Sequence, residues 1–363
     1  MKVLHLTKVQ GIGGAEQHLL QLLPALRERG VDARFLSLDA GGDARRFHDA
    51  LDQRGVPWQR VACGADVSPR LLADVARAAH AAQPDLVHTH MVHADVYGSV
   101  AAALGRRPLV STRHNDDRYL LGPFRYVDRL FMHKATTIVA ISDAVREFHI
   151  RAGLPASKLV TIHYGLDEAP SRPSELTPEQ AGVAEGAPLV LAVGRLIEQK
   201  DHATLLAAFA RVREQHPEAR LAILGWGPLE QETRERAAAL GLAGSVLLPG
   251  RVEPSAWLAR ADVFAHTSRW EGFGIVLLEA MLAALPVVAT RASAIPEIVA
   301  DGITGLLAAP GDADAIAAAI GALLADPDRG RALGEAGRRR ALDEFSVGRM
   351  TDRTLAVYAD ALR

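Results

Sequence analysis

The chain has 363 residues, of which 49% are hydrophobic and 23% are charged, values typical of a globular protein with room for two domains. Its net charge of −2 argues against a general nucleic-acid binder. The single cysteine, Cys63, excludes an intrachain disulfide and a cysteine metal cluster.

The first predicted unit is a strand, a glycine loop and a helix. Residues 3–6 form a short apolar run typical of a buried strand, and the glycine loop 11–14 follows it. Leucines at i, i+3, i+4 and i+7 then mark one face of a helix in which Pro24 should cause a kink. These leucines are Leu19, Leu22, Leu23 and Leu26.

Glycines in the loop allow a backbone to approach a phosphate or a sugar closely, which makes Gly13 and Gly14 candidate ligand contacts. A simple tight turn is the alternative, because the G-x-G-x-x-G pattern is not completed: Glu16 occupies the last position. Gly30 should end the helix, and residues 31–38 read as the next strand.

Histidines follow the next predicted strands. His88, His90 and His93 come after a strand at 85–87, and His114 comes after one at 109–112. The H-x-H-x-x-H spacing lacks an obvious carboxylate partner and is not a known zinc motif, so we expect polar residues of a cleft and no metal site.

Residues 120–134 mix apolar side chains with Arg125, Arg129 and Lys134. This pattern favours an ordinary surface helix and leaves open an amphipathic helix that lies on a membrane.

The same plan restarts near residue 188. Residues 189–193 form an apolar strand, a loop opens at Gly194, and a helical face of apolar residues follows at 205–212. A further strand at 221–224 is ended by Gly225-Trp226-Gly227-Pro228. Strands that alternate with helices predict parallel sheets, and two such runs predict an α/β protein of two doubly wound, Rossmann-like domains.

Two cations follow the strand at 189–193. Arg195 and Lys200 would lie at the carboxyl edge of a parallel sheet, where they suit a diphosphate. The alternative is a solvated loop in which they pair with Glu198 or Asp201. The sequence has no P-loop motif, which argues against ATP hydrolysis.

Two acids stand eight positions apart, at Glu271 and Glu279. Between them, Gly272-Phe273-Gly274 reads as a tight loop, and the apolar run from Ile275 reads as the start of a helix. The N–H groups at such a helix start form an anion site. Because acids would repel the anion, they are better suited to accept hydrogen bonds from hydroxyl groups on either side of it. This arrangement predicts a nucleotide sugar as ligand.

The segment from Glu271 to Glu279 resembles the E-x7-E motif of retaining glycosyltransferases of family 4. Further motifs match that family in order along nearly the whole chain. They are Gly13-Gly14-Ala15-Glu16, Gly194-Arg195 with Lys200, Gly225-x-Gly227-Pro228, Pro286-Val287-Val288-Ala289 and Ile303-Thr304-Gly305-Leu306.

The resemblance implies the GT-B fold, with two Rossmann-like domains facing each other across a cleft that holds the site. The expected parts are an acceptor-binding domain at 1–167, a linker at 168–187, a nucleotide-sugar-binding domain at 188–343, and a helix at 344–363 that crosses back to the first domain.

The resemblance also implies roles for residues. Arg195 and Lys200 would hold the donor diphosphate in place of a metal, Glu271 would contact the donor sugar, and Glu279 would take the ribose hydroxyls. The remaining implied contacts are the N–H groups of Phe273, Gly274 and Ile275, the backbone of Arg251 and Val252 at the base, Gly13 and Gly14 at the diphosphate, Gly225 and Gly227 at the donor, and His114 near the transferred sugar.

The expected enzyme is a metal-independent, retaining hexosyltransferase without a cofactor. Its donor would be a UDP-sugar before a GDP-sugar, and its acceptor a glycan, a lipid-linked intermediate or a small molecule. A GT-B nucleotide-sugar epimerase and a non-catalytic nucleotide-sugar-binding subunit remain alternatives, whereas the incomplete glycine pattern disfavours a Rossmann dehydrogenase.

The predicted location is the cytoplasm. The sequence start leaves no room for the apolar core of a signal peptide, and the longest apolar stretch, 275–290, is interrupted by Glu279 and Pro286. Peripheral contact with the inner face of the membrane is left open.

Overall fold

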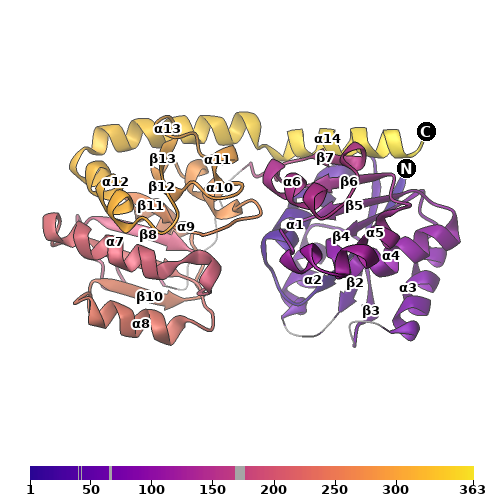
Figure 1. Ribbon diagram of the computed structural model, residues 1–363, viewed down its shortest axis with the longest axis horizontal. Coiled ribbons are helices and arrows are strands. Elements are labelled where there is room, and N and C mark those ends of the chain that lie inside the picture. The colour runs from indigo at the N-terminus through magenta and orange to yellow at the C-terminus, as the bar shows by residue number, and fades with distance from the viewer. Residues whose placement is uncertain (40, 42, 65–67, 168–175) are drawn as a thin grey trace. The chain divides into compact units, whose positions relative to one another are not determined.

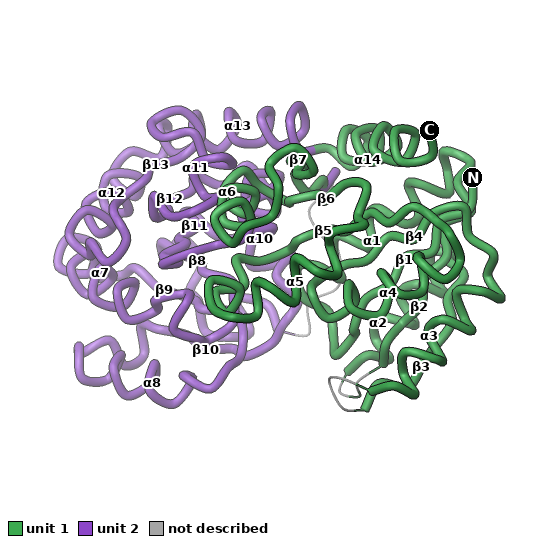
Figure 2. The backbone as a smooth tube through the Cα atoms, turned by 45° about the vertical axis from the view of Figure 1, so that its right-hand side comes forward, with its two compact units in different colours: residues 1–165, 346–363 green, residues 166–345 purple. Residues whose placement is uncertain are grey.

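The computed structural model describes residues 1–39, 41, 43–64, 68–167 and 176–363. Contacts between Cα atoms divide the chain into two compact units (Figure 2). Unit 1 comprises residues 1–165 and 346–363, and unit 2 comprises residues 166–345. The predicted linker starts at 168–175, which lies outside the described residues, and the predicted domain boundaries stay a prediction.

The described part of unit 1 holds a seven-stranded parallel sheet in the order β3-β2-β1-β4-β5-β6-β7 (Figure 1). Its strands are β1 (Lys2–Val9), β2 (Asp32–Asp39), β3 (Trp58–Ala62), β4 (Leu86–His90), β5 (Leu109–Arg113), β6 (Thr137–Ala140) and β7 (Leu159–Thr161).

Helices cover both faces of this sheet. Apolar residues of α1, α2 and α14 pack on one face, and those of α3 and α4 pack on the other. The helices are α1 (Gly14–Glu28), α2 (Ala44–Gln53), α3 (Pro69–Ala82), α4 (Met91–Gly105), α5 (Phe124–Met132), α6 (Asp143–Arg151) and α14 (Val347–Ala361), with 3-10 turns η1 (Arg118–Leu121) and η2 (Ala156–Lys158).

The described part of unit 2 holds a six-stranded parallel sheet in the order β10-β9-β8-β11-β12-β13. The strands are β8 (Leu189–Val193), β9 (Arg220–Leu224), β10 (Val246–Gly250), β11 (Val263–His266), β12 (Val287–Thr290) and β13 (Gly305–Ala308). The helices are α7 (His202–Gln215), α8 (Glu230–Ala239), α9 (Ser255–Arg260), α10 (Ile275–Leu282), α11 (Ile295–Ile298), α12 (Ala313–Ala325) and α13 (Pro327–Glu344), with a 3-10 turn η3 (Glu198–Lys200).

The two-residue period of β1 explains how one strand serves two cores. Val3 and Val9 belong to the core under α1 and α14, whereas Leu4 and Leu6 belong to the core under α3 and α4. Because both faces are covered, such strands read as continuous apolar runs rather than as alternating ones. His5, between Val3 and Val9 in this period, therefore points toward α1 and α14.

Several predicted elements are confirmed. The leucine face from 19 to 26 is buried in α1, which runs through Pro24. Gly30 adopts φ +82°, and the N–H of Val31 donates to the carbonyl of Leu26 at 3.0 Å, which closes the helix end as expected. The strand predicted at 189–193 is β8, and α10 begins at Ile275. The α/β class with two doubly wound sheets is confirmed.

One prediction was wrong. The sequence ended a strand at residue 87 and put the following histidines in a cleft, whereas β4 continues to His90. His88 and His90 are 1% and 0% exposed, because hydrogen bonds inside the protein satisfy their ring nitrogens.

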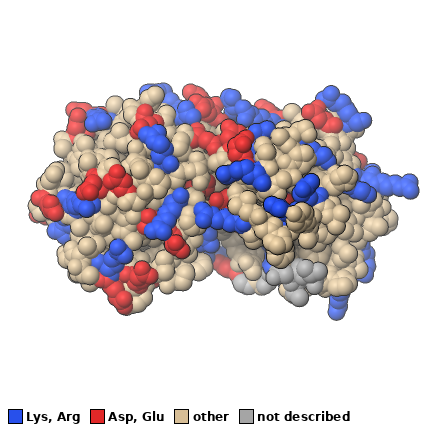
Figure 3. Space-filling view, in the orientation of Figure 1, with Lys and Arg blue, Asp and Glu red and all other residues tan. Residues whose placement is uncertain are grey.

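Two surface properties complete the description. Lys, Arg, Asp and Glu side chains are interspersed over the face of the molecule in Figure 3. Within the described ranges, every helix is too short or too polar to form a transmembrane span.

Candidate active site

The strand order places a candidate site at the carboxyl edge of the unit 2 sheet. Strands β8 and β11 are neighbours, but the chain leaves them in opposite directions, toward β9 and toward β12. Ligands of doubly wound sheets bind at such a switch point. The loop after β8 carries Arg195 and Lys200, and the loop after β11 carries Glu271.

Lys200 and Glu271 form an ion pair between these two loops. The Lys200 Nζ lies 2.6 Å from Oε2 of Glu271, and their side chains are only 13% and 12% exposed. His266 Nε2 and Ser268 Oγ lie 3.2 Å from the same carboxylate oxygen. The site therefore holds one carboxylate that three polar groups fix in place.

Glu271 is ionised in this setting. Burial by itself would raise the pKa of its carboxyl, but the charge of Lys200 and the hydrogen bond to His266 outweigh burial and hold this pKa far below its usual range. Burial lowers the pKa of His266, although its bond to Glu271 opposes this change. The result is an ionised carboxylate beside a neutral imidazole.

Glu279 lies one helix turn deeper, in α10, and is 3% exposed. Burial, together with the charge of Glu253, raises the pKa of its carboxyl to about 8. The two acids that stand eight positions apart in the sequence thus differ in charge state: Glu271 is ionised and Glu279 is neutral at pH 7.

The start of α10 lies between these acids. Gly274 adopts φ +94°, which favours glycine, and Ile275 begins the helix. The N–H groups of the first turn of a helix have no carbonyl partner within it, so they can bind an anion. Phe273 is buried against Phe345, with ring centroids 6.0 Å apart, and holds the loop down.

Arg195 is exposed, and its guanidinium forms no hydrogen bond or ion pair with another described residue. The alternative arrangement, in which both cations pair with Glu198 or Asp201, is not found among the described residues: Lys200 binds Glu271, and Arg269 binds Asp201 at 3.1 Å. Arg195 is therefore the cation of this loop that is open to solvent.

Gly225 and Gly227 serve a packing role in the structure. A Cβ atom on Gly225 would lie 1.8 Å from the carbonyl oxygen of Gly194, and one on Gly227 would lie 2.3 Å from that of Leu196. These glycines let the loop after β9 approach the backbone that carries Arg195. Between them, Trp226 is 54% exposed.

Arg251 and Val252 directly follow β10, the edge strand of the unit 2 sheet. They therefore lie at the same carboxyl edge as Lys200, two strands away from β8. A cavity of about 230 Å³ borders the loop after β8; its lining includes Asp201, Arg236 and Arg269 but neither Glu271 nor Glu279.

In unit 1, the loop after β1 carries Gly13 and Gly14, with Gly14 as the first residue of α1. The N–H of Gly13 donates to Oε2 of Glu16 at 2.9 Å, so a side chain already occupies one of the N–H groups offered to a phosphate. Burial raises the pKa of this Glu16 carboxyl.

His114 belongs to a buried chain of histidines in unit 1. Its Nε2 lies 3.1 Å from Nδ1 of His90, whose Nε2 lies 3.0 Å from Nδ1 of His5. At the other end, Nδ1 of His114 meets the Tyr164 hydroxyl at 2.5 Å, and His18 stacks on the Tyr164 ring with centroids 4.5 Å apart. His114 is 5% exposed, and both its ring nitrogens are engaged.

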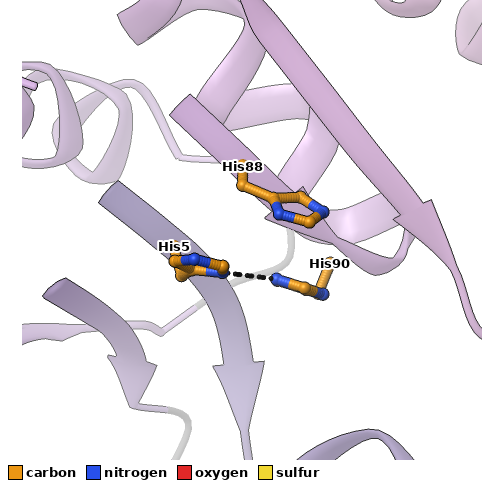
Figure 4. Close-up of side chains that lie close together, drawn as sticks. All are labelled: His5, His88 and His90. Carbon is orange, nitrogen blue, oxygen red and sulfur yellow. Dashed lines mark hydrogen bonds between the residues drawn. The ribbon is translucent and has the colours of Figure 1, made fainter. Parts of the chain in front are cut away.

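The chain continues beyond His5 to α14. The Tyr358 hydroxyl lies 3.4 Å from Nε2 of His5 and 2.6 Å from Nδ1 of His88, and Nε2 of His88 lies 2.7 Å from the Thr112 hydroxyl. Figure 4 shows His5, His88 and His90 together, with the bond between His5 and His90 drawn.

Neutral imidazoles satisfy every link of this chain. If each carries its proton on Nε2, Tyr164 donates to His114, His114 to His90, His90 to His5, and His5 to Tyr358. Burial lowers the pKa of His5 to about 3 and holds those of His88, His90 and His114 well below the usual value. A ligand hydroxyl at His114 would have to replace one of its two present partners.

The ligand atoms of His5, His88 and His90 lie within 4.8 Å of one another, which is close enough to consider a metal. Hydrogen bonds already explain this closeness, and the three rings are fully buried without a carboxylate among them. A divalent cation there would have no counter-charge.

The sequence did not indicate His266, Ser268, His5, Tyr164 or Tyr358. For His266 and Ser268 a signal was present, because polar residues there directly follow an apolar strand. The other three are scattered over the chain, and only the fold brings them to His114.

Two protein-family models match the chain. The model described as Glycosyltransferase Family 4 matches residues 12–169, and the one described as Glycosyl transferases group 1 matches residues 174–340. Together they account for most of both units.

Curated relatives and solved structures agree with these matches. The alpha-maltose-1-phosphate synthase of Mycolicibacterium smegmatis is 30% identical over 95% of each chain. The GDP-mannose-dependent alpha-(1-6)-phosphatidylinositol monomannoside mannosyltransferase of the same organism is 34% identical over 68% of this chain and 69% of its own. HepE of Anabaena, solved in complex with UDP and glucose, is 27% identical over 99% of each chain with a TM-score of 0.86.

Proposed function

This chain belongs to family 4 of the GT-B glycosyltransferases and acts on a nucleotide-sugar donor, and we propose that it transfers a hexosyl unit from a UDP-sugar to a hydroxyl group with retention of configuration. HepE, crystallised with UDP and with UDP-glucose, supports the choice of base. A GDP-sugar is the second choice, because one relative is GDP-mannose-dependent.

The observation that carries the proposal is the arrangement of charges after β8 and β11. Arg195 is exposed, Lys200 is held by Glu271, and the start of α10 lies beside them. An ammonium has three N–H donors, so Lys200 can keep its bond to Glu271 while it binds a phosphate oxygen. Lys200 and Arg195 then stabilise the leaving diphosphate without a metal.

The transfer step breaks the bond between the sugar C1 and the phosphate oxygen, and the electron pair stays on the diphosphate. The acceptor oxygen bonds to C1 on the same face, and its proton passes to the departing phosphate oxygen. Glu271 orients the sugar hydroxyls in this step. We therefore expect Glu271→Gln to slow turnover while UDP still binds.

The remaining donor contacts extend this proposal. Glu279 takes the ribose hydroxyls, the backbone of Arg251 and Val252 meets the base, and the N–H groups of Phe273, Gly274 and Ile275 meet sugar or phosphate. Gly225 and Gly227 hold the donor loop in position. In unit 1, Gly13 and Gly14 are assigned to the diphosphate and His114 to the transferred sugar.

The acceptor is a glycan, a lipid-linked intermediate or a small molecule, and the cytoplasm remains the predicted location. Thermal-shift measurements with UDP, GDP and ADP rank the bases, because a ligand at 100 times its Kd stabilises the folded state by about 2.7 kcal/mol.

Arg195→Ala tests the proposal directly. Loss of a group that stabilises developing charge typically lowers turnover by about 10²–10³-fold. We expect that loss in UDP release from UDP-sugars, whereas Arg211→Ala, which removes an exposed arginine from α7 paired with Asp314, should leave turnover unchanged. Normal turnover in Arg195→Ala would refute the diphosphate assignment.

A further inference from the structure

Exposed apolar side chains gather in one short segment of unit 1. The segment consists of η1 (Arg118–Leu121) and α5 (Phe124–Met132), and we name its exposed side the η1–α5 surface. Leu130 is 72% exposed and Phe124 is 63% exposed, which is unusual for large apolar residues so close in sequence. The exposed apolar side chains are Tyr119, Leu121, Phe124, Tyr126, Val127 and Leu130.

Helix α5 differs from an ordinary surface helix in which residues it buries and which it exposes. Such a helix buries its apolar stripe and exposes its charges. In α5 the buried residues are Asp128 and Met132. Asp128 accepts a hydrogen bond of 2.7 Å from Arg113, whose side chain is 0% exposed and also lies 3.1 Å from Asp95. An internal ion pair therefore anchors the helix and leaves its apolar residues outside.

The charges of the segment have one sign at the surface. Asp128 is the only acid between residues 118 and 134, and it is buried. Arg118, Arg129 and Lys134 are exposed, and the Arg125 guanidinium lies 4.9 Å above the Tyr126 ring. Two half-buried acids, Asp116 and Asp117, precede the segment, and burial raises the pKa of Asp117 to about 6.

We propose that the η1–α5 surface binds the face of an anionic lipid bilayer. Aromatic and aliphatic side chains ringed by arginine and lysine are the composition that enters the boundary between headgroups and acyl chains. Cations near such a membrane are attracted by its negative surface potential. A bilayer fits better than an acidic protein, because the exposed aromatic and leucine side chains outnumber the cations and need an apolar environment.

The position of the surface adds to this argument. It begins four residues after His114, at the carboxyl edge of the unit 1 sheet, which is the edge that also carries Gly13 and Gly14. A protein bound through this surface would hold that edge near the membrane. Binding to lipid stands on the surface alone and does not depend on the proposed transfer reaction.

Sedimentation of the full chain with vesicles tests the proposal. We expect binding to vesicles of phosphatidylcholine with phosphatidylglycerol, weaker binding at high salt, and little binding to phosphatidylcholine alone, because salt screens the attraction. Phe124→Ser with Leu130→Ser should lower the vesicle affinity at least about tenfold.

Matched variants separate this surface from general stickiness. Ile303 and Leu342 in unit 2 are 65% and 43% exposed, and their double serine variant should bind vesicles like the unchanged protein. Arg118→Gln with Lys134→Gln should lose the preference for anionic vesicles. Unchanged thermal unfolding of each variant shows that it is folded.

Three results would overturn the proposal. They are no sedimentation with anionic vesicles, an equal loss in both double serine variants, and a dimer without vesicle binding that Phe124→Ser with Leu130→Ser converts to a monomer. In the last case the surface joins two copies of the chain. UDP release measured without vesicles tests the proposed function separately, so the failure of one proposal is distinguishable from that of the other.

Discussion

The two units share a strand order but differ in what they bury at the carboxyl edge. Unit 1 buries neutral imidazoles that hydrogen-bond to one another, from His114 through His90 to His5. Unit 2 holds a mostly buried charged pair, Lys200 with Glu271, beside the start of α10. Unit 1 also buries a charge at this edge, Arg113 at the end of β5, but Asp95 and Asp128 pair with it inside the fold, whereas the Lys200–Glu271 pair shares its loop with the exposed Arg195.

The difference indicates which unit is prepared for an anion. Neutral rings that satisfy one another gain nothing from a phosphate, whereas a lysine with spare N–H donors beside an exposed arginine does. A buried pair is seldom retained for stability alone, because apolar residues of similar size often serve as well. These contrasts can be tested in both units.

The largest expected effect is a loss of stability of unit 1 in acid. The folded-state pKa values of its buried histidines are lowered, so the unfolded chain binds more protons below pH 6.5, and stability falls as the pH drops below that value. Each histidine contributes up to about 1.4 kcal/mol per pH unit. Asp95, Asp117 and Glu16 oppose this, since their raised pKa values favour the folded state in acid, but the histidines with a lowered pKa outnumber them.

Hydrogen exchange at pH 5 and pH 7 measures this effect unit by unit. Between pH 7 and pH 5, amide protection should fall much further in β1 and β4 than in β8 and β11. Equal loss in both units would contradict the comparison, because in unit 2 the buried histidines with lowered pKa that the structure describes are His202 and His266.

The next largest effect is expected for Lys200→Ala. It leaves the Glu271 carboxylate buried without its cation, which typically costs about 3–5 kcal/mol of folding free energy. Turnover should fall by about 10²–10³-fold or more. Denaturant unfolding and UDP release measure the two losses.

A double variant separates the loss of stability from the loss of turnover. Lys200→Met with Glu271→Leu should recover most of the stability, because no buried charge is left unpaired, and recover none of the turnover. Recovery of turnover would show that the pair is only structural.

A smaller effect is expected for His90→Phe. It leaves Nδ1 of His5 and Nε2 of His114 without a partner, at a cost of about 1–3 kcal/mol each. His90→Gln can donate and accept one bond and should recover part of the loss. His80→Phe, at an exposed position of α3, should change stability by less than about 0.5 kcal/mol. Equal effects at both positions would contradict the role of His90 in the hydrogen-bonded series of histidines.

The smallest effect is expected for Glu279→Gln. The folded-state pKa of this carboxyl is raised to about 8. The carboxyl therefore lowers the free energy of unfolding of the protein as the pH rises from about 4.5 to 8. An uncharged amide avoids this loss and should stabilise the protein by about 1–3 kcal/mol at pH 8, and little at pH 5. Thermal unfolding at both pH values measures it, and equal effects would show that Glu279 is ionised in the fold.

The sequence predicts the framework because local patterns record burial. The strand at 189–193 is apolar on both faces since helices cover both, and the leucines of α1 repeat because one face is buried. Glu271 and Glu279 stand out because a glycine loop and the start of a helix lie between them. Their assignment to a donor stays a prediction.

The hydrogen-bond partners were not predictable from local pattern. Lys200 and Glu271 are 71 positions apart, and His5 and His90 are 85 apart. Histidine also reads as polar, so the sequence ended β4 too early, although paired neutral rings can be buried in a strand. The sequence of α5 is typical of an ordinary surface helix, because it does not show that Arg113 binds Asp128 and so buries the polar side of this helix.

The place of Tyr358 in the chain has a consequence for biosynthesis. Its hydroxyl reaches His88, and α14 packs on α1, yet residues 166–345 are made between the first part of unit 1 and this helix. A nascent chain therefore lacks the Tyr358 partner of His88 and the packing of α14 on this face until all of unit 2 has been translated. The part of the protein that is synthesised first is therefore completed only when its last helix, α14, has been made.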